Sequence, residues 1–294
     1  MGANREAGRP IALALAAAVV ATGGVACSSG SGATDDAGGE VDAALDGDAA
    51  PDVDEDATDA EDGDGGPDRP DLVRYVDPFI GTDDSSSPHP VPGGAGGSTY
   101  PGPVVPFGMV QLGPDTPTAS PSGYRFSDTA IQQFSVTHFN GAGCPNNEDL
   151  PFLPMAGELT MSPGGSWNRY SSDFLKSNES ASPGYYRVLL DRWGIDVELT
   201  ATTRTGFARF TFPPTDQARV LFQSGLSANG AFDGSIEIVA PDRMRGSFTT
   251  GAFCFSASRF RMHFVVVFDR PFTGFRTWLG SELLPDATSS TAPR

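Results

Sequence analysis

Residues 182–213 hold three consecutive segments in which apolar and polar side chains alternate, and this pattern constrains the region to β-structure. In the middle segment, residues 195–202, apolar side chains occupy every second position, which predicts a strand with one buried face. Residues 185–190 precede it across an Asp-Arg-Trp-Gly turn, and residues 207–212 follow it and end at Pro213. Three such segments joined by short turns predict an antiparallel sheet.

Strand patterns also dominate the rest of the C-terminal region, where no helical period is sustained over three turns. Further short apolar segments recur between turns rich in Gly and Pro, at residues 219–223, 235–239, 247–250 and 261–268. Many short strands, with 20 Phe available for a core, predict an all-β fold, a β-sandwich over residues 72–294. Residues 263–268 are almost wholly apolar, so we expect that strand to be buried on both faces.

The N-terminus has the composition of an export signal. Arg5 and Arg9 precede an apolar run, residues 11–21, and small residues follow as far as Cys27. A basic flank, a short apolar run and small residues before the cleavage point are typical of a signal peptide, which we assign to residues 1–27. Small residues before a cysteine also resemble a lipoprotein signal, which predicts lipidation of Cys27 and a membrane-anchored protein on the outer membrane or cell surface. Cleavage near Ala26 and secretion is the alternative.

Residues 28–71 form an acidic segment without aromatic residues. Up to Pro70 they contain 15 Asp or Glu against one basic residue, Arg69, so most of the net charge of −18 lies here. Such a composition cannot bury enough apolar surface to fold, so we expect a disordered linker. An EF-hand loop starting at Asp52 fails, because Ala57 and Gly63 stand where that loop needs Gly and Glu. The chain offers no basic stripe for phosphates, and we expect no nucleic-acid partner.

Three sequence blocks then carry a resemblance to a known family. The first is VDPFIGT at residues 76–82 with YPGPVVPFGMVQ at residues 100–111. The second is GYRF at residues 123–126 with FSVTHFNGAGC at residues 134–144, and the third is the strand region 182–213. In this order they resemble the N-terminal domain of glycoside hydrolase family 92, the calcium-dependent exo-acting α-mannosidases. The resemblance implies a β-sandwich of the galactose-mutarotase-like, or supersandwich, type.

The resemblance also implies what lies outside this chain. The family follows the sandwich with a C-terminal (α/α)-barrel and hydrolyses α-mannoside glycans with inversion, which needs an acid and a base on opposite faces of the sugar. Both carboxylates and most calcium ligands belong to the barrel, so no catalytic or metal-binding residue is carried over to this chain. We therefore expect calcium only in the full-length enzyme and no activity from this chain alone. A stand-alone carbohydrate-binding module and an inactive truncated remnant are the alternatives.

Candidate sugar-binding residues lie in the Gly-rich part of the chain. His138, Asn140 and Gly141 match a family loop that faces the sugar, and an Asn amide or a His ring can bridge neighbouring hydroxyls. A loop-bracing role for His138 is the alternative. Asp149 follows this loop, Asp83 follows the Gly-Thr of the first block, and Arg125 stands in the second block. Turn capping is the alternative for the two Asp residues, and structural ion pairing is the alternative for Arg125.

Cys144 and Cys254 are the thiols other than Cys27, and export makes a disulfide bond between them possible. No Ser-His-Asp order or zinc-ligand spacing is present in the sequence. Residues 93–97 are Gly-rich but lack the lysine of a phosphate-binding loop.

Overall fold

A computed structural model describes residues 11–16, 72–83, 96–118, 120–165, 167–284 and 287–291. Residues 11–16 and the described residues from Val73 onward belong to the first of two units of the chain. The assignments of Cys27 and of the acidic linker lie outside the described residues. Among the described residues, no helix has the length and apolar character needed to span a bilayer.

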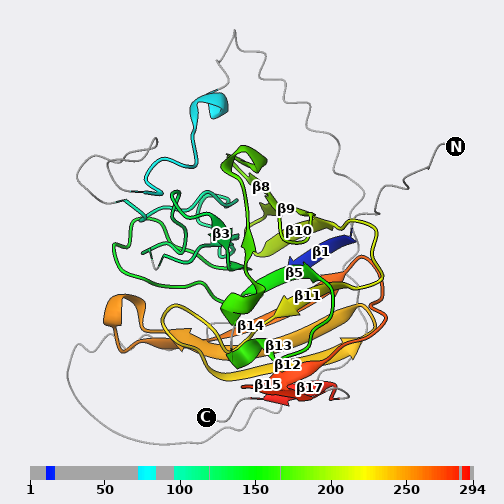
Figure 1. The fold of residues 1–294 in the computed structure, drawn as a ribbon. Helices are drawn as coiled ribbons and strands as arrows, with labels where there is room; N and C mark the ends of the chain where they lie inside the picture. The colour runs from blue at the N-terminus through cyan, green and yellow to red at the C-terminus, as the bar shows by residue number, and fades with distance from the viewer. Residues whose placement is uncertain are drawn as a thin grey trace, which may run out of the picture. The chain divides into compact units, whose positions relative to one another are not determined.

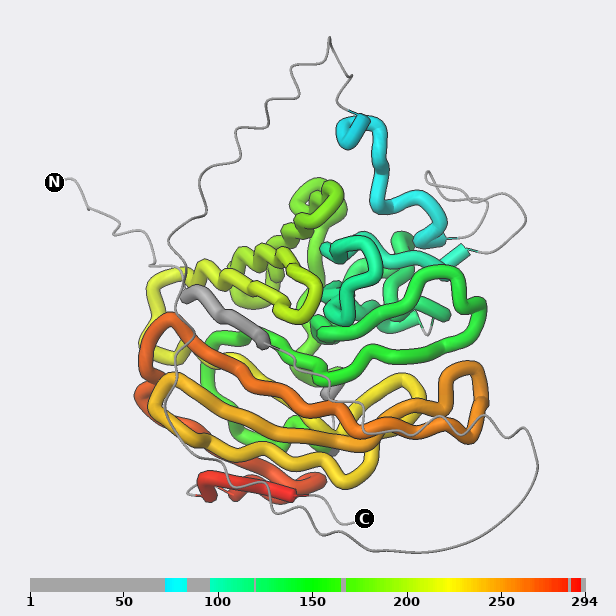
Figure 2. The backbone as a smooth tube through the Cα atoms, turned by 180° about the vertical axis from the view of Figure 1, so that it is seen from behind, coloured from blue at the N-terminus to red at the C-terminus, as the bar shows by residue number. Residues whose placement is uncertain are grey.

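The larger sheet of the first unit has nine strands, and all of its pairings are antiparallel. Figure 1 shows it curving across the molecule, and Figure 2 shows its long strands side by side from behind. In spatial order the strands are β17 (Ser289–Thr291), β12 (Phe232–Ala240), β13 (Arg243–Gly251), β14 (Arg259–Phe268), β1 (Ile11–Ala16), β10 (Thr205–Thr211), β9 (Ile195–Ala201), β8 (Tyr185–Leu190) and β7 (Glu179–Ser182).

A second sheet of four strands lies in front of the larger one in Figure 1. Its order is β11 (Ala218–Phe222), β5 (Phe152–Ala156), β4 (Gln133–Ser135) and β2 (Gly113–Asp115). Two small strand pairs complete the described β-structure: β15 (Thr277–Leu279) with β16 (Glu282–Leu284), and β3 (Ala130–Ile131) with β6 (Ser172–Asp173). The helical elements among the described residues are five 3₁₀ turns: η1 (Val73–Tyr75), η2 (Pro163–Gly165), η3 (Trp167–Tyr170), η4 (Lys176–Asn178) and η5 (Phe253–Phe255).

The core lies between the two sheets and is rich in aromatic rings. Phe152 on β5 packs against Phe210 on β10, with ring centroids 6.2 Å apart, and so joins the two sheets. It also stacks on Phe134 and Phe222, at 5.7 and 5.9 Å. Aromatic contacts of this geometry add to the large apolar area that each ring buries. The all-β prediction and the β-sandwich are therefore confirmed.

The expectation that residues 263–268 are buried on both faces was wrong. Phe264 and Val266 are buried, but His263 is exposed, and Val265 and Val267 are only half-buried. β14 belongs to the outer layer of a sandwich, so the smaller sheet covers only one of its faces. An apolar run without alternation does not distinguish this arrangement from a strand enclosed on both sides.

Candidate functional site

Four of the six predicted sugar-binding residues, His138, Asn140, Gly141 and Asp149, lie on one loop between β4 and β5. An antiparallel bridge between Thr137 and Asp149 closes the loop at its base. The backbone N–H of Glu148 also donates to the Thr137 carbonyl, at 2.9 Å. The structure therefore brings these residues together, with buried side chains at the base and exposed ones at the tip.

His138 is completely buried and is held on three sides. Its Nδ1 lies 2.8 Å from the Gln111 carbonyl oxygen, and its Nε2 lies 2.9 Å from Oδ1 of Asp115. Because a carbonyl only accepts, Nδ1 carries a hydrogen, and the contact with Asp115 then needs a second proton on either the imidazole or the carboxyl group. The ring of Tyr100 stacks on the imidazole at 4.4 Å. The Ser135 hydroxyl donates to the other Asp115 oxygen, so both side chains of the pair are fully engaged.

Asp149 connects the loop to the larger sheet. Its carboxylate accepts hydrogen bonds from the Thr137 hydroxyl at 2.7 Å and from the Thr250 hydroxyl, on β13, at 2.8 Å. Burial raises the pKa of Asp149, and these hydrogen bonds, together with the nearby His138, act in the opposite direction. The described contacts of Asp149 are thus those of a side chain that fixes the loop from below.

Glu148 is the most perturbed carboxyl group near this loop. Burial, followed by the charges of Asp115 and Asp149, raises the pKa of Glu148 to about 9, so the side chain carries a proton at neutral pH. Its backbone has a positive φ of 56°, which is uncommon outside glycine. A Cβ at Gly123 would lie 2.8 Å from Asp115 Oδ1 and 3.1 Å from Glu148 Cγ, so only glycine fits against these carboxyl groups.

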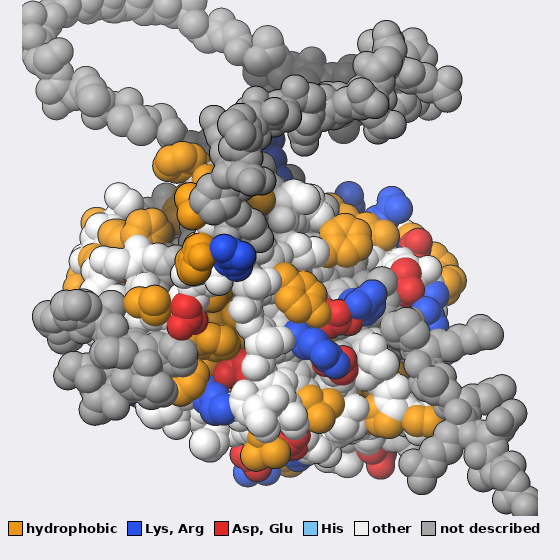
Figure 3. Space-filling view, turned by 90° about the horizontal axis from the view of Figure 1, so that it is seen from above, with side chains coloured by type: hydrophobic (Ala, Val, Ile, Leu, Met, Phe, Trp, Pro, Cys, Tyr) orange, Lys and Arg blue, Asp and Glu red, His pale blue; other side chains and the backbone are white. Residues whose placement is uncertain are grey.

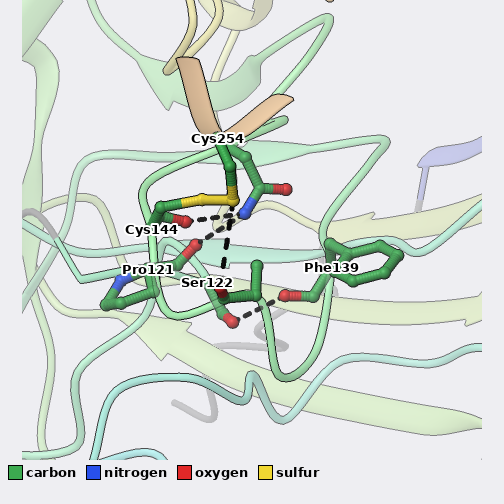
Figure 4. The surroundings of a disulfide bond; sticks show 7 residues. Pro121, Ser122, Phe139, Cys144 and Cys254 are labelled. Carbon is green, nitrogen blue, oxygen red and sulfur yellow. Dashed lines mark hydrogen bonds between the residues drawn. A yellow bond between two sulfur atoms is a disulfide. The ribbon is translucent and has the colours of Figure 1, made fainter. Parts of the chain in front are cut away.

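The tip of the loop is exposed and is fixed by a disulfide bond. Phe139, Asn140, Gly141 and Gly143 are exposed. The Cys144–Cys254 disulfide, with Cα atoms 5.7 Å apart, ties the loop to η5. Figure 4 shows the disulfide beside Pro121 and Ser122, where the Ser122 hydroxyl donates to the Phe139 carbonyl at 2.7 Å.

Aromatic side chains border this tip. The ring of Phe139 packs edge-on against Phe253 of η5, with centroids 5.3 Å apart. Phe255 is 91% exposed, and its backbone, like that of Ala252 and Cys254, has a positive φ. Strained backbone of this kind persists where the surroundings fix it, and here the disulfide is part of those surroundings.

The other two predicted residues pair with each other. Arg125 Nε lies 3.0 Å from Asp83 Oδ1, and Asp83 also accepts the backbone N–H of Ser127 at 2.8 Å. Asp83 is buried, whereas the Arg125 side chain is 30% exposed. The face of the molecule seen from above in Figure 3 carries acidic and basic side chains interspersed with one another.

Two hollows among the described residues differ clearly in size and lining. The larger, of about 780 Å³, lies along β11 and residues 270–280 and is partly aromatic, with Phe222, Phe268 and Phe272 in its wall. The smaller, of about 260 Å³, is lined by Glu148 and by polar side chains that include Gln133 and Ser227. None of the six predicted sugar-binding residues lines either hollow.

The part of the chain that the structure describes has no group of three or more His, Cys, Asp or Glu side chains placed to hold a metal ion. Asp115, Glu148 and Asp149 are neighbours, but Asp115 and Asp149 already accept hydrogen bonds from hydroxyl groups. The donor set of these residues does not fit calcium, which takes six to eight oxygen ligands.

Comparisons with known proteins agree with one another. Residues 75–294 match the model of the glycosyl hydrolase family 92 N-terminal domain. No functionally curated protein matches the chain. Among solved structures, the family GH92 alpha-mannosidase BT3965 from Bacteroides thetaiotaomicron, also solved with mannoimidazole, is 30% identical with a TM-score of 0.61, over 70% of this chain and 26% of that one.

Two further solved structures extend the comparison. The family GH92 inverting mannosidase BT2199 from Bacteroides thetaiotaomicron is 26% identical, with a TM-score of 0.56, over 75% of this chain and 28% of that one. The GH92 family glycosyl hydrolase ccman5, at 22% identity and a TM-score of 0.64, shares the fold over 75% of this chain and 29% of its own. The chain thus spans about a quarter of the length of the solved relatives it matches.

Proposed function

This chain belongs to glycosyl hydrolase family 92, and we propose that its sandwich supplies one wall of the sugar pocket of an exo-acting, inverting α-mannosidase. The observation that carries the proposal is the exposed loop tip, residues 139–143, fixed on a buried polar base and by a disulfide bond. Binding sites are commonly placed on loops that a rigid scaffold positions. The similarity to an α-mannosidase solved with mannoimidazole supports a mannoside as the ligand.

The loop tip offers groups that suit a sugar. Asn140 uses its Oδ1 to accept the backbone N–H of Tyr100 at 3.2 Å, which orients the amide and leaves its NH₂ group for hydroxyl oxygens. Gly141 and Gly143 have positive φ values, and no atom lies within 4 Å of a Cβ placed on either. A pyranose ring can therefore approach the backbone closely there. His138, by contrast, is a positioning residue in this proposal, because both of its ring nitrogens are already bonded.

Catalysis in this proposal comes from the rest of the enzyme. Inversion needs an acid and a base separated widely enough to admit a water molecule. Asp115 and Asp149 beneath the loop are buried and bonded to this chain's own hydroxyl and imidazole groups, so they cannot reach both faces of a bound sugar. The family resemblance implies that the full-length enzyme needs calcium for activity. In this proposal the calcium site is likewise assigned to the rest of the enzyme.

Export and anchoring complete the proposal. Cleavage before Cys27, lipidation of that residue and a linker of residues 28–71 would hold the sandwich on a membrane surface. Mass spectrometry of the mature N-terminus tests this part directly. An unmodified Cys27 at that position would refute the lipid anchor.

The test of the pocket role uses an aryl α-mannoside with calcium present. We expect no hydrolysis by the purified processed chain, and hydrolysis by a fusion in which the rest of the BT3965 enzyme follows residue 294. In that fusion, Asn140→Ala removes a hydrogen bond to the sugar and lowers kcat/KM about tenfold. Asn178→Ala, an exposed Asn on η4, is the matched control and leaves kcat/KM unchanged.

Two results would overturn the proposal. One is hydrolysis by the chain alone that disappears when a carboxylate within residues 72–294 is replaced. The other is equal activity of the Asn140→Ala and Asn178→Ala fusions. Mannoside binding by the chain alone, undiminished by Asn140→Ala, would favour a stand-alone carbohydrate-binding module that uses another surface.

A further inference from the structure

β1 lies in the interior of the larger sheet, between β10 and β14 (Figure 1). It pairs with β10 over six residues, from Ile11 opposite Phe210 to Ala16 opposite Thr205. On its other side it pairs with β14 over four residues, from Leu13 opposite Phe268 to Ala16 opposite Val265. β10 and β14 are thus neighbours of β1 and not of each other.

The same six residues belong to the apolar run that follows Arg5 and Arg9. Cleavage near Ala26 or Cys27 would remove them from the exported chain, since both positions follow Ala16 in the sequence. Removal of β1 would leave a gap between β10 and β14, which we call the slot. The facing edges of these two strands would then carry two rows of unpaired backbone N–H and C=O groups in the middle of a sheet. Such rows readily pair with an added strand.

The walls of this slot specify what can fill it. Ala208 and Phe210 on β10 and Val266 on β14 are buried on the core side of the sheet. Residues directly opposite one another in paired strands share a face, so an occupant needs apolar side chains at every second position. It also needs an extended backbone without proline, because both of its edges donate hydrogen bonds.

We propose that this slot accepts a β-strand from the part of the enzyme that lies outside this chain. The inference rests on the proposed function, since it assigns the donor to the same enzyme. Its support is that the solved relatives extend well beyond the matched region, which covers only 26–29% of their length. The donated strand completes the sandwich and joins it to the catalytic part through backbone hydrogen bonds.

Hydrogen exchange measured by mass spectrometry tests the acceptor slot on the processed, exported full chain. Within residues 205–210 and 265–268, the amides that face the slot are expected to exchange at least about tenfold faster than in the unprocessed chain, because their strand partner is missing. A peptide with the sequence of residues 11–16 and two added lysines restores protection. The same peptide with proline in place of Leu13 is the matched control and does not. Amides of the β12–β13 pair serve as the internal reference.

The fusion with the rest of the BT3965 enzyme tests the source of the strand. Its slot amides are expected to be protected without peptide, and the peptide no longer binds. Three results would overturn the proposal. The first is a mature chain that retains residues 11–16, and the second is a processed chain whose slot amides are protected from exchange without peptide, either as a monomer or by dimerisation. The third is an active fusion that binds the peptide as the processed chain does. A fusion with a protected slot and no hydrolysis would count against the proposed function alone.

Discussion

Replacing Glu148 with Gln should stabilise the domain, and the gain should grow with pH. The unfolded carboxyl group titrates at its ordinary pKa of 4.5, whereas burial and the charges of Asp115 and Asp149 raise the pKa of Glu148 to about 9 in the folded protein. Between these two values the folded state binds more protons than the unfolded state, so unfolding releases a proton and stability falls as pH rises. A Gln side chain has a similar shape and bears no charge, so it does not carry this cost.

The structure sets the size of the effect. Each pH unit above the unfolded pKa costs about 1.4 kcal/mol, which gives roughly 3 kcal/mol at pH 7 and roughly 5 kcal/mol at pH 8. Glu148 retains some solvent exposure, so screening reduces these figures, and we halve them. The expected gain in the free energy of unfolding for Glu148→Gln is then below about 1 kcal/mol at pH 5 and about 2 kcal/mol at pH 8.

Urea denaturation of the processed chain, followed by tryptophan fluorescence at pH 5, 7 and 8, measures this gain. Urea is uncharged, so the midpoint and slope can be compared across pH. Glu282→Gln, an exposed Glu on β16, is the matched control and should show no pH-dependent difference from the wild type. A Glu148→Gln gain that is flat or shrinks between pH 5 and pH 8 would show that Glu148 is ionised in the folded protein and would refute the reasoning.

Two further predictions concern the loop. Replacing both Cys144 and Cys254 with Ala should lower the free energy of unfolding by up to about 4 kcal/mol, because the disulfide bond closes a sequence separation of 110 residues. Urea denaturation measures the loss. Dithiothreitol should have no further effect on the stability of the variant. Gly123→Ala should lower the melting temperature more than Gly143→Ala, since both have positive φ but only the first Cβ meets Asp115; equal shifts would contradict the steric argument.

The sequence predicted the larger sheet better than the smaller one. Residues 185–212 alternate clearly, and β8, β9 and β10 lie where the pattern placed them. β2 and β4 show no alternation, because all three residues of each are buried, and β2 consists of Gly, Pro and Asp. These strands form through tertiary pairing, which outweighs their weak intrinsic preference for β-structure.

For the candidate site, too, the sequence revealed some of the residues and missed others. The Gly-rich loop and His138 could be found from the family resemblance. The partners that hold His138 could not, because Asp115 lies 23 residues away and Tyr100 contacts the ring only through the fold. For Glu148 the sequence shows only the adjacent Asp149, because its raised pKa depends first on burial and then on Asp115, which the fold brings from β2. Sequence patterns report local periodicity, whereas charge and burial at a site are set by distant segments.

The proposed sugar-pocket loop and the proposed strand slot lie at opposite ends of β14. Thr250, which holds Asp149, pairs with Phe260 near the start of β14, whereas β1 pairs with Val265 to Phe268 at its end. At about 3.3 Å per residue, Phe260 and Val266 are roughly 20 Å apart along the strand. An open slot therefore leaves the hydrogen bonds beneath the loop intact. The loop can hold its shape before the strand is donated, and the two proposals can fail independently.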